Sequence, residues 1–366
     1  MANIINEFKP DYAVHPGTVL EEILESQGLS KSEFAERAGL TPKTVSLIVT
    51  GKAHVTPENA VVFERVLGIS AHIWSNLDVE YRLFCARQED QKNQASAVEW
   101  SKRFPLTSLS QRKIIPPDLN AEQKAVALLR LFGVRDINAW DARYGNIHVA
   151  FRSSAAFESN YEAVVTWLRL AEIKAEKIQT KPYDANKFKE ALREIRKLTD
   201  SNPDIFGPKM QTLCNDCGVA LVMLSELPKT RLSGATRWLS NKALIAMSLR
   251  HKSNNHFWFT FFHEAAHIVK HGKKDVYVDV DNLRRTKQED EADRFAADFL
   301  IPTGKYNNFV SSTHQFTRDI IRRFAHSIGI APGIVVGRLQ HDNHLDYSCL
   351  NELKVRFMLK EEPLSV

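Results

Sequence analysis

The chain has 366 residues with a formal net charge of +5, and 43% of the residues are hydrophobic and 25% charged, which is typical of water-soluble proteins long enough for two or three domains. No apolar stretch approaches the roughly 20 residues that span a bilayer, and the first residues lack the basic and apolar regions of a secretory signal. Four cysteines provide no disulfide framework, so we expect a cytoplasmic protein without membrane association.

Residues 15–80 are predicted to form five helices, four of them short. The second begins at Ser30, whose side chain can cap it together with Glu33 three residues later, and it ends at Gly39. Thr-Pro pairs begin the third and fourth helices, as at Pro42, because proline is favoured at the first helical position. The sequence SAHIWSNLDVEYRLFCARQ opens a fifth and longer helix.

The helix pair around Gly39 is typical of a helix-turn-helix. Small Ala35 lets the two helices approach closely, and Gly39 permits the bend between them. The second helix of such a pair lies in the major groove of DNA. The stretch HPGTVLEEILESQGLSKSEFAERAGLTPKTVSLIVTGK, followed by GISAHIWSNLDVEYRL, resembles HigA-type antitoxins of the Cro/C1 helix-turn-helix class over about residues 15–84.

This resemblance implies a set of DNA contacts. Bases would be contacted by Lys43, Ser46 and Leu47, and phosphates by Lys31, Thr44 and Lys52. It also implies that Val45 and Ile48 are buried in the core of the domain.

The charge of this segment favours a second interpretation. Residues 1–80 carry 6 Lys+Arg and 11 Asp+Glu, whereas phosphate contacts supply much of the affinity of a protein for DNA. The fold could therefore serve dimerisation or protein binding without DNA. If operator DNA is the partner, a homodimer would help by pairing two weak half-sites.

The remainder of the chain changes from helices to strands and back. GVALVMLSEL, GATRWLS and KALIAMSLR are short, apolar and separated by turn residues, which predicts a small sheet followed by a helix, a charged loop at 272–286, a helix at about 287–300 and a C-terminal helical segment. We expect a mainly α protein with a small β-sheet (α+β), divided into a five-helix domain at 1–84, a linker at 85–120, a helical middle region at 121–215 and a C-terminal domain at 216–366.

The segment FTFFHEAAHIVKHG, residues 259–272, contains candidate metal ligands and a candidate general base. His263 and His267 lie one helical turn apart on one face, so both imidazoles can bind one ion. Glu264 beside them could act as general base toward a water activated by zinc, which is the logic of H-E-x-x-H peptidases. The alternative is a buried amphipathic helix that carries these histidines for packing.

A third ligand is available in TKQEDEADRFAADFLIP, residues 286–302. Glu289 can complete three protein ligands, and Asp293, one turn later, could accept the N–H of a ligating histidine. An acidic run can also be a solvated helix face. However, the opposite face must dock against the protein, because it is formed by Phe295, Ala296, Phe299 and Leu300.

Together, HEAAH and EDEADRFAADFLIP resemble the ImmA/IrrE family of zinc metallopeptidases over about residues 210–340. The resemblance implies a zincin-like domain with one zinc ion on His263, His267 and Glu289, and Glu264 as general base. It further implies that the substrate is a bacterial repressor or a similar regulator. Glu291 points away from the ligand face, and His271 is interpreted as the C-terminal residue of the helix.

Several further assignments stay open at this stage. The substrate peptide is expected at a sheet edge beside the metal, formed by GATRWLS or ALIAMSL. The CxxC of Cys214 and Cys217 is interpreted as a buried pair at a helix end rather than a redox switch. FAHSIGIAPGIVVGRL, residues 324–339, is interpreted as a structural helix pair. Candidates for polarising the scissile carbonyl are Arg237, Tyr306 and His314.

Two function hypotheses follow. In the first, a DNA-binding regulator carries a zinc endopeptidase that cleaves a repressor, an antitoxin or its own linker. In the second, the chain is an antitoxin-like repressor without proteolysis, whose C-terminal half holds a partner such as a cognate toxin.

Overall fold

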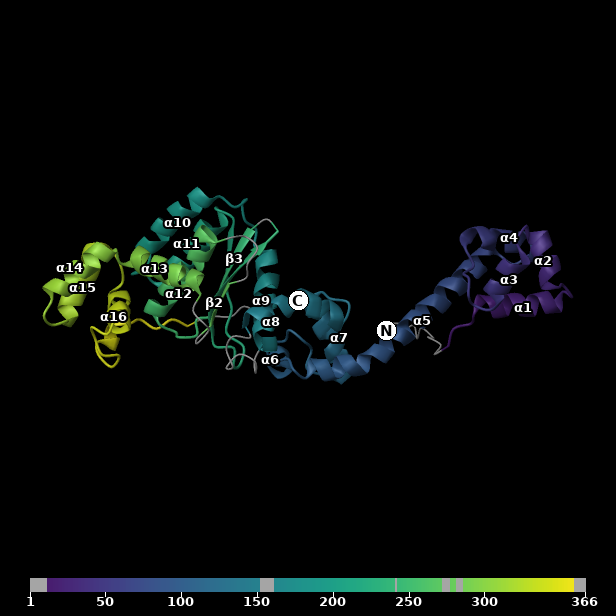
Figure 1. The fold of residues 1–366 in the computed structure, drawn as a ribbon, viewed down its shortest axis with the longest axis horizontal. Coiled ribbons are helices and arrows are strands. Elements are labelled where there is room, and N and C mark those ends of the chain that lie inside the picture. The colour runs from purple at the N-terminus through teal and green to yellow at the C-terminus, as the bar shows by residue number, and fades with distance from the viewer. Residues whose placement is uncertain (1–11, 152–160, 241, 272–276, 281–285, 359–366) are drawn as a thin grey trace, which may run out of the picture. The chain divides into compact units, whose positions relative to one another are not determined.

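The computed structural model describes most of the chain and divides it into two compact units, at Ser96 and Ala97 (Figure 1). Within the described part, no helix is both long and apolar enough to cross a membrane. The described residues are 12–151, 161–240, 242–271, 277–280 and 286–358.

The first unit is a bundle of four short helices and the first part of a longer fifth helix, as the sequence predicts. The capping box of the second helix is present: Ser30 Oγ accepts from the backbone N–H of Glu33 at 3.2 Å, and Glu33 Oε2 accepts from that of Ser30 at 2.9 Å. Gly39 ends this helix with φ 63°, a left-handed conformation that favours glycine. The helices are α1 (Pro16–Ser26), α2 (Lys31–Ala38), α3 (Pro42–Val49), α4 (Pro57–Leu67) and α5 (Ala71–Ser101).

The first turn of α1 packs closely against the backbone of α3. A Cβ on Gly17 would lie 2.2 Å from the carbonyl oxygen of Ile48, so only glycine allows this approach. His15 caps α1, because its Nδ1 accepts from the backbone N–H of Gly17 at 3.0 Å. The inner face of α3 is fully buried: Val45 and Ile48 are both 0% exposed, which confirms that expectation.

The expected linker at 85–120 requires a correction. Helix α5 continues without a break through Ser101, and α6 (Leu106–Gln111) follows it closely. Trp100, Phe104, Leu109 and Ile115 are all buried in the core of the second unit. The segment is polar overall, but these widely spaced apolar side chains suffice to dock it.

The second unit is built on a sheet with strand order β1-β3-β2-β4. The three expected strands are confirmed, and a fourth lies in the segment expected to be a loop. Strands β1 and β3 are parallel and the other pairs antiparallel. The strands are β1 (Val219–Met223), β2 (Leu232–Leu239), β3 (Lys242–Met247) and β4 (Tyr277–Val280).

This order corrects the expected peptide-binding edge. GATRWLS forms most of β2 and ALIAMSL most of β3, and both strands have a neighbour on each side. Within the described strands, the edges of the sheet are β1 and β4. The sequence did not reveal this, because strand order depends on long-range pairing.

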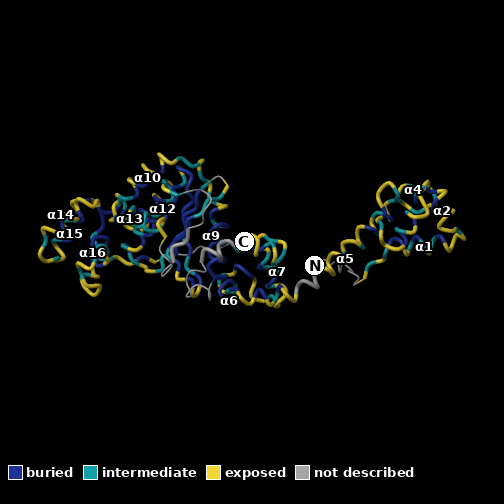
Figure 2. Tube along the Cα trace, in the orientation of Figure 1, coloured by how far each residue is buried: buried dark blue, intermediate teal, exposed yellow. Residues whose placement is uncertain are grey.

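Helices cover both faces of the sheet, and the buried residues concentrate along it (Figure 2). A hydrophobic core lies on each face of the sheet, and successive side chains of β3 alternate between the two cores. Ile245 and Met247 face the first core, and Leu244 and Ala246 face the second. The first core is closed by α10 (Ala185–Lys197), α11 (Pro203–Asn215), α12 (Asn254–Lys270), α13 (Lys287–Leu300), α14 (Thr303–Ser312), α15 (Arg318–Ile328) and α16 (Pro332–His341). The second is closed by α7 (Ala121–Phe132), α8 (Ile137–Phe151) and α9 (Tyr161–Lys177). The expected middle region therefore supplies layers to both faces and belongs to this unit.

A buried ion-pair group ties α9 to the sheet. Glu172 is 2% exposed, and its carboxylate lies 3.0 Å from Arg169 and also accepts from Arg237 on β2. The neighbouring residue on β2, Thr236, points to α12 on the opposite face. Arg237 is thus directed away from α12, and we withdraw it as a candidate for polarising a carbonyl.

Candidate metal centre

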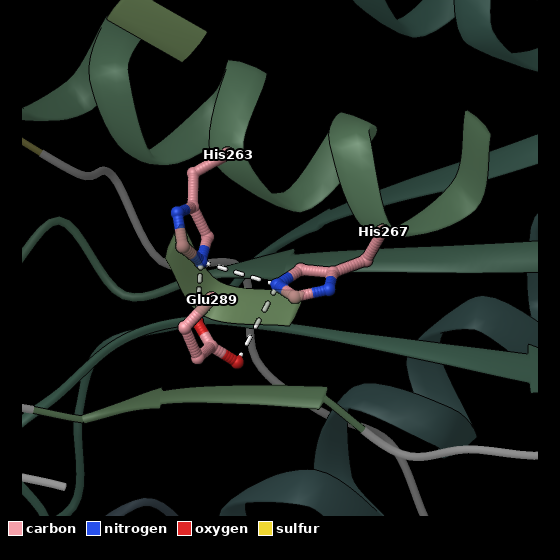
Figure 3. A group of neighbouring side chains, drawn as sticks. All are labelled: His263, His267 and Glu289. Atoms are coloured by element: carbon pink, nitrogen blue, oxygen red, sulfur yellow. Dashed lines mark hydrogen bonds and ion pairs between the residues drawn. The ribbon is translucent and has the colours of Figure 1, made fainter. Parts of the chain in front are cut away.

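Helix α12 presents the two histidines of HEAAH from a rigid position. Its other face is anchored in the first core by Phe257, Phe261 and Ala265, all at most 5% exposed. His263 and His267 consequently project toward α13, as Figure 3 shows. Because they lie on successive turns of one buried helix, their relative position is determined by the helix itself.

Helix α13 brings the third donor. The side chain of Thr286 caps it by accepting from the backbone N–H of Glu289 at 3.2 Å, which places Glu289 in the first turn. Ala292 and Ala296 are fully buried, and such small residues let α13 approach α12 closely. The apolar face of this acidic segment therefore docks, as the sequence predicts.

The three donors fit a zinc ion. His263 Nε2 lies 3.2 Å from His267 Nε2 and 3.0 Å from a Glu289 oxygen, and His267 Nε2 lies 3.6 Å from the other oxygen. Tetrahedral ligands at about 2.0–2.1 Å from zinc are about 3.3 Å apart, and each of these separations is within about 0.3 Å of that value, although the two carboxylate distances go to different oxygens of Glu289. Two imidazoles and one carboxylate are also a donor set that zinc prefers in catalytic sites.

Each histidine has a hydrogen-bond partner on its other ring nitrogen. Asp293 Oδ1 lies 2.9 Å from His263 Nδ1, as expected from the sequence. His271 Nδ1 lies 2.9 Å from His267 Nδ1, and His271 Nε2 lies 3.4 Å from Glu291 Oε2. Such partners determine the tautomer of each ring and leave the lone pair of Nε2 available to bind a metal.

The role of His271 and Glu291 was missed by sequence reasoning. His271 is indeed the residue that ends α12, but it also contacts His267. The spacing of four residues from His267 was the signal, since it places His271 on the same helix face. Glu291 could not be assigned without knowing how α13 packs.

The ionisation of the donors suits metal binding. Burial opposes ionisation of Glu289, but hydrogen bonds and positive charge from His263 and His267 outweigh it and lower the pKa of this carboxyl to about 2. Burial lowers the pKa of His267 below its ordinary value of 6.5, although Glu289 acts in the opposite direction. At neutral pH the carboxylate is therefore anionic and the His267 imidazole neutral, the forms that bind a metal.

Glu264, the expected general base, lies where α12 meets β2. It is 0% exposed, and its Oε2 lies 2.6 Å from the hydroxyl oxygen of Thr236, which donates to it. Gly234 leaves the space for this carboxylate, because a Cβ there would lie 2.6 Å from Glu264 Oε1. Strand β2 thus determines the position of the Glu264 side chain.

The other residues singled out in the sequence are the two remaining candidates for polarising the carbonyl and the two cysteines of the CxxC. The guanidinium of Arg338 lies over the ring of Tyr306, 4.7 Å from its centroid, and burial and Asp342 raise the pKa of Tyr306. His314 is exposed. Cys214 and Cys217 are buried at the end of α11, and burial raises the pKa of both thiols, which supports a structural interpretation.

The expected DNA contacts of the first unit differ in exposure. Lys43 and Ser46 on α3 and Lys52 after it are exposed, whereas Leu47 is half-buried. The Thr44 hydroxyl is hydrogen-bonded to that of Thr41 at 2.8 Å. The ammonium of Lys31 lies 2.6 Å from Glu21 of α1, so binding a phosphate would require it to leave this carboxylate.

Comparisons with known proteins match both parts of the chain. A family model described as helix-turn-helix matches residues 20–74, and one described as an IrrE N-terminal-like domain matches residues 221–339. An uncharacterized helix-turn-helix transcriptional regulator of Escherichia coli (strain K12), YddM, is 38% identical over 68 residues, which are 19% of this chain and 72% of that protein. Virulence-associated protein I of Dichelobacter nodosus is 34% identical over 80 residues, 22% of this chain and 74% of that protein.

Among solved structures, an addiction module antidote protein of the HigA family from Coxiella burnetii is 25% identical, covering 22% of this chain and 87% of that chain with a TM-score of 0.21. The two family matches coincide with the two resemblances inferred from the sequence, which are thereby confirmed.

Proposed function

This chain belongs to the helix-turn-helix transcription regulators and carries an IrrE N-terminal-like, metallopeptidase-type domain, and we propose that it is a DNA-binding regulator with a zinc-dependent endopeptidase in its second unit. The observation that carries this proposal is the convergence of His263, His267 and Glu289, whose donor atoms all lie within 4.8 Å of one another. We infer one zinc ion per chain at these residues.

The surrounding residues have separate roles in the proposed reaction. Zinc, when bound, supplies a Lewis acid that activates water and polarises a carbonyl. Asp293 and His271 orient the two ligating rings, and Glu264 acts as general base by taking a proton from the attacking water and passing it to the leaving amine. Thr236 holds the Glu264 carboxylate by hydrogen bonding to one of its oxygens.

An edge strand offers a place for the substrate. Among the residues that the structure describes, β4 pairs with β2 and with no other strand, and β2 packs against α12. We propose that the peptide adds to β4 as a further strand, because sheet edges bind extended peptides through their backbone. By family resemblance, the substrate is a repressor, an antitoxin or a similar regulator.

The first unit is proposed to bind operator DNA through α3, with Lys43, Ser46 and Leu47 at bases and Lys31, Thr44 and Lys52 at phosphates. Exposed apolar residues on α4 and α5 support a homodimer, since they would be covered in one. They are Val61 at 43% exposure, Ile73 at 50%, Val79 at 57% and Leu83 at 41%. A dimer would pair two weak half-sites on the operator and thereby raise the overall affinity of an acidic domain.

One observation favours a second candidate function. Complete burial of Glu264 against β2 is also compatible with a structural carboxylate, and then the chain would be a non-proteolytic repressor whose second unit holds a partner such as a toxin. The two candidates differ in the outcome of the substitution Glu264→Gln. Only the peptidase requires this carboxylate.

The first test is the zinc content of the purified chain beside that of Glu289→Ala. About one zinc per chain, lost in the variant, supports the site, whereas no zinc in either protein after reconstitution would overturn it. The second test compares new protein termini in cells that express wild type or Glu264→Gln. Termini present only with wild type support proteolysis, and identical sets favour the non-proteolytic candidate.

A further inference from the structure

A groove of about 630 Å³ lies beside the metal centre. Its floor is the first part of α12, and its walls are α13 and α16. The volume lies within the range of about 300–1,000 Å³ that is usual for ligand sites. Asp293 lines it, whereas His263, His267 and Glu289 do not, so the groove adjoins the metal centre without being part of it.

The groove combines an apolar surface with an amide that lacks a partner. Phe259, Ala297 and Ile334 supply apolar side chains. Asn255 Oδ1 is buried and, among the residues the structure describes, has no hydrogen-bond partner. Gly337 makes room for this amide, because a Cβ there would lie 2.7 Å from Asn255 Nδ2. This oxygen is covered by protein atoms, so the groove offers a ligand its apolar side chains and its charged groups.

The charges of the groove are of both signs. Arg338 is neutralised by Asp342 at 2.6 Å, and Asp293 is hydrogen-bonded to His263. Asp290 and Arg294 remain, and within the described ranges neither side chain forms an ion pair; Arg294 Nε donates only to the Asp290 carbonyl, at 3.0 Å. Three carboxylates disfavour a phosphate-bearing ligand, and the charged walls disfavour a lipid.

We propose that this groove binds a short internal segment of another protein, with an apolar side chain on the Phe259 surface between one basic and one acidic residue. The basic residue pairs with Asp290, and the acidic residue pairs with Arg294. A segment of this kind has no net charge, in agreement with the one remaining charge of each sign in the groove. Binding does not require cleavage, so the site stands independently of the proposed peptidase.

The probes are two capped tripeptides, acetyl-Lys-Leu-Glu-amide and acetyl-Glu-Leu-Lys-amide, titrated calorimetrically into the full chain, with recovery of intact peptide verified afterwards. We expect one of the two peptides to bind saturably and in preference to the other, which has the reverse order of charged residues. Arg294→Asp, an exposed substitution, should weaken that binding about five- to tenfold by replacing attraction with repulsion. Arg323→Asp on α15 makes the same charge change outside the groove and should leave binding unchanged.

A second variant tests the apolar surface independently of charge. Ala297→Phe should fill the groove and abolish binding of the preferred peptide, while a melting temperature close to that of wild type verifies folding. Uncapped Leu-Leu distinguishes a free peptide ligand from a protein segment, because its own terminal charges could meet Asp290 and Arg294. The proposal is overturned if neither capped peptide saturates, if both arginine variants behave alike, or if only the uncapped peptide binds.

Discussion

Replacing Asp293 with alanine should weaken zinc binding while leaving all three ligands in place. Asp293 Oδ1 accepts a hydrogen bond from His263 Nδ1 at 2.9 Å, so the carboxylate orients the ring and increases the basicity of Nε2. His263 is 4% exposed and has little freedom to find water instead. The ligand would then be less well oriented and less basic.

The magnitude follows from the exposure of the carboxylate. Removal of such partners weakens metal affinity by about 10- to 100-fold. The Asp293 side chain is 35% exposed, so solvent screens its charge, and we expect the lower end, about tenfold or about 1.4 kcal/mol. Asp293→Asn should lose less, because the amide oxygen can still accept from His263.

The assay is competition for zinc with a chelator of known affinity at pH 7. Asp290→Ala is the matched control, because it removes the same charge from the same helix and lies outside the contacts of the two histidines in the described structure. Equal zinc affinity of the two alanine variants would refute the reasoning. So would an Asp293→Asn variant weaker than Asp293→Ala.

Three further predictions concern the general base, the ligands and the DNA. Gly234→Ala places a methyl group 2.6 Å from Glu264 Oε1, so it should lower the free energy of unfolding in urea by about 1–3 kcal/mol and reduce cleavage without releasing zinc. The control is Gly304→Ala, whose methyl group would meet nothing within 4 Å. This control should change neither the stability nor the cleavage. Burial lowers the pKa of His267 below 6.5 and the pKa of Glu289 is about 2, so zinc should be half released only below pH 6.5, as His267 and not the carboxylate takes up a proton. A release midpoint above 6.5 in a pH series would contradict this. Lys52→Ala should reduce the slope of log affinity for operator DNA against log salt by about 0.9, and an unchanged slope would remove Lys52 from the phosphate contacts.

The sequence predicted those parts of the site that depend on local geometry. His263 and His267 share a helix face because of the helical period, and Glu289 with Asp293 repeats this relation on the next helix. The helix-turn-helix was equally local, since capping and proline signals placed its boundaries within a few residues. Such relations require no knowledge of the remainder of the fold.

The missed features all depend on contacts between distant segments. Glu291 supports His271 only because α13 packs against α12, and β4 became the sheet edge only through its pairing with β2. Likewise, Trp100 and Phe104 lie in the segment expected to be a linker, and α7 and α8 supply surfaces that bury them. Single-sequence patterns contain no information about such pairings.

Zinc should serve chemistry in this protein rather than hold the fold together. In small zinc domains, the metal supplies the folding free energy and chelation unfolds the chain. Here α12 is anchored by Phe257, Trp258, Phe261 and Phe262, all at most 5% exposed, so the two histidines are positioned by the core with or without a metal. Glu289 lies 3.0 Å from His263 Nε2 and 3.6 Å from His267 Nε2, and its surroundings lower the pKa of its carboxyl to about 2, so the site holds this carboxylate in its ionised form.

We therefore expect chelation to lower the melting temperature of the second unit but to leave its helical circular dichroism at 25 °C unchanged. Mass action limits the loss of stability to the binding term, about 4 kcal/mol for zinc at a thousand times its dissociation constant. If chelation instead unfolds the unit, zinc is a structural element, and the non-proteolytic candidate becomes the better account. An intact fold without the metal leaves Glu264 and the ligand face organised to receive it, as expected of a catalytic site whose three protein ligands leave the fourth position open for water.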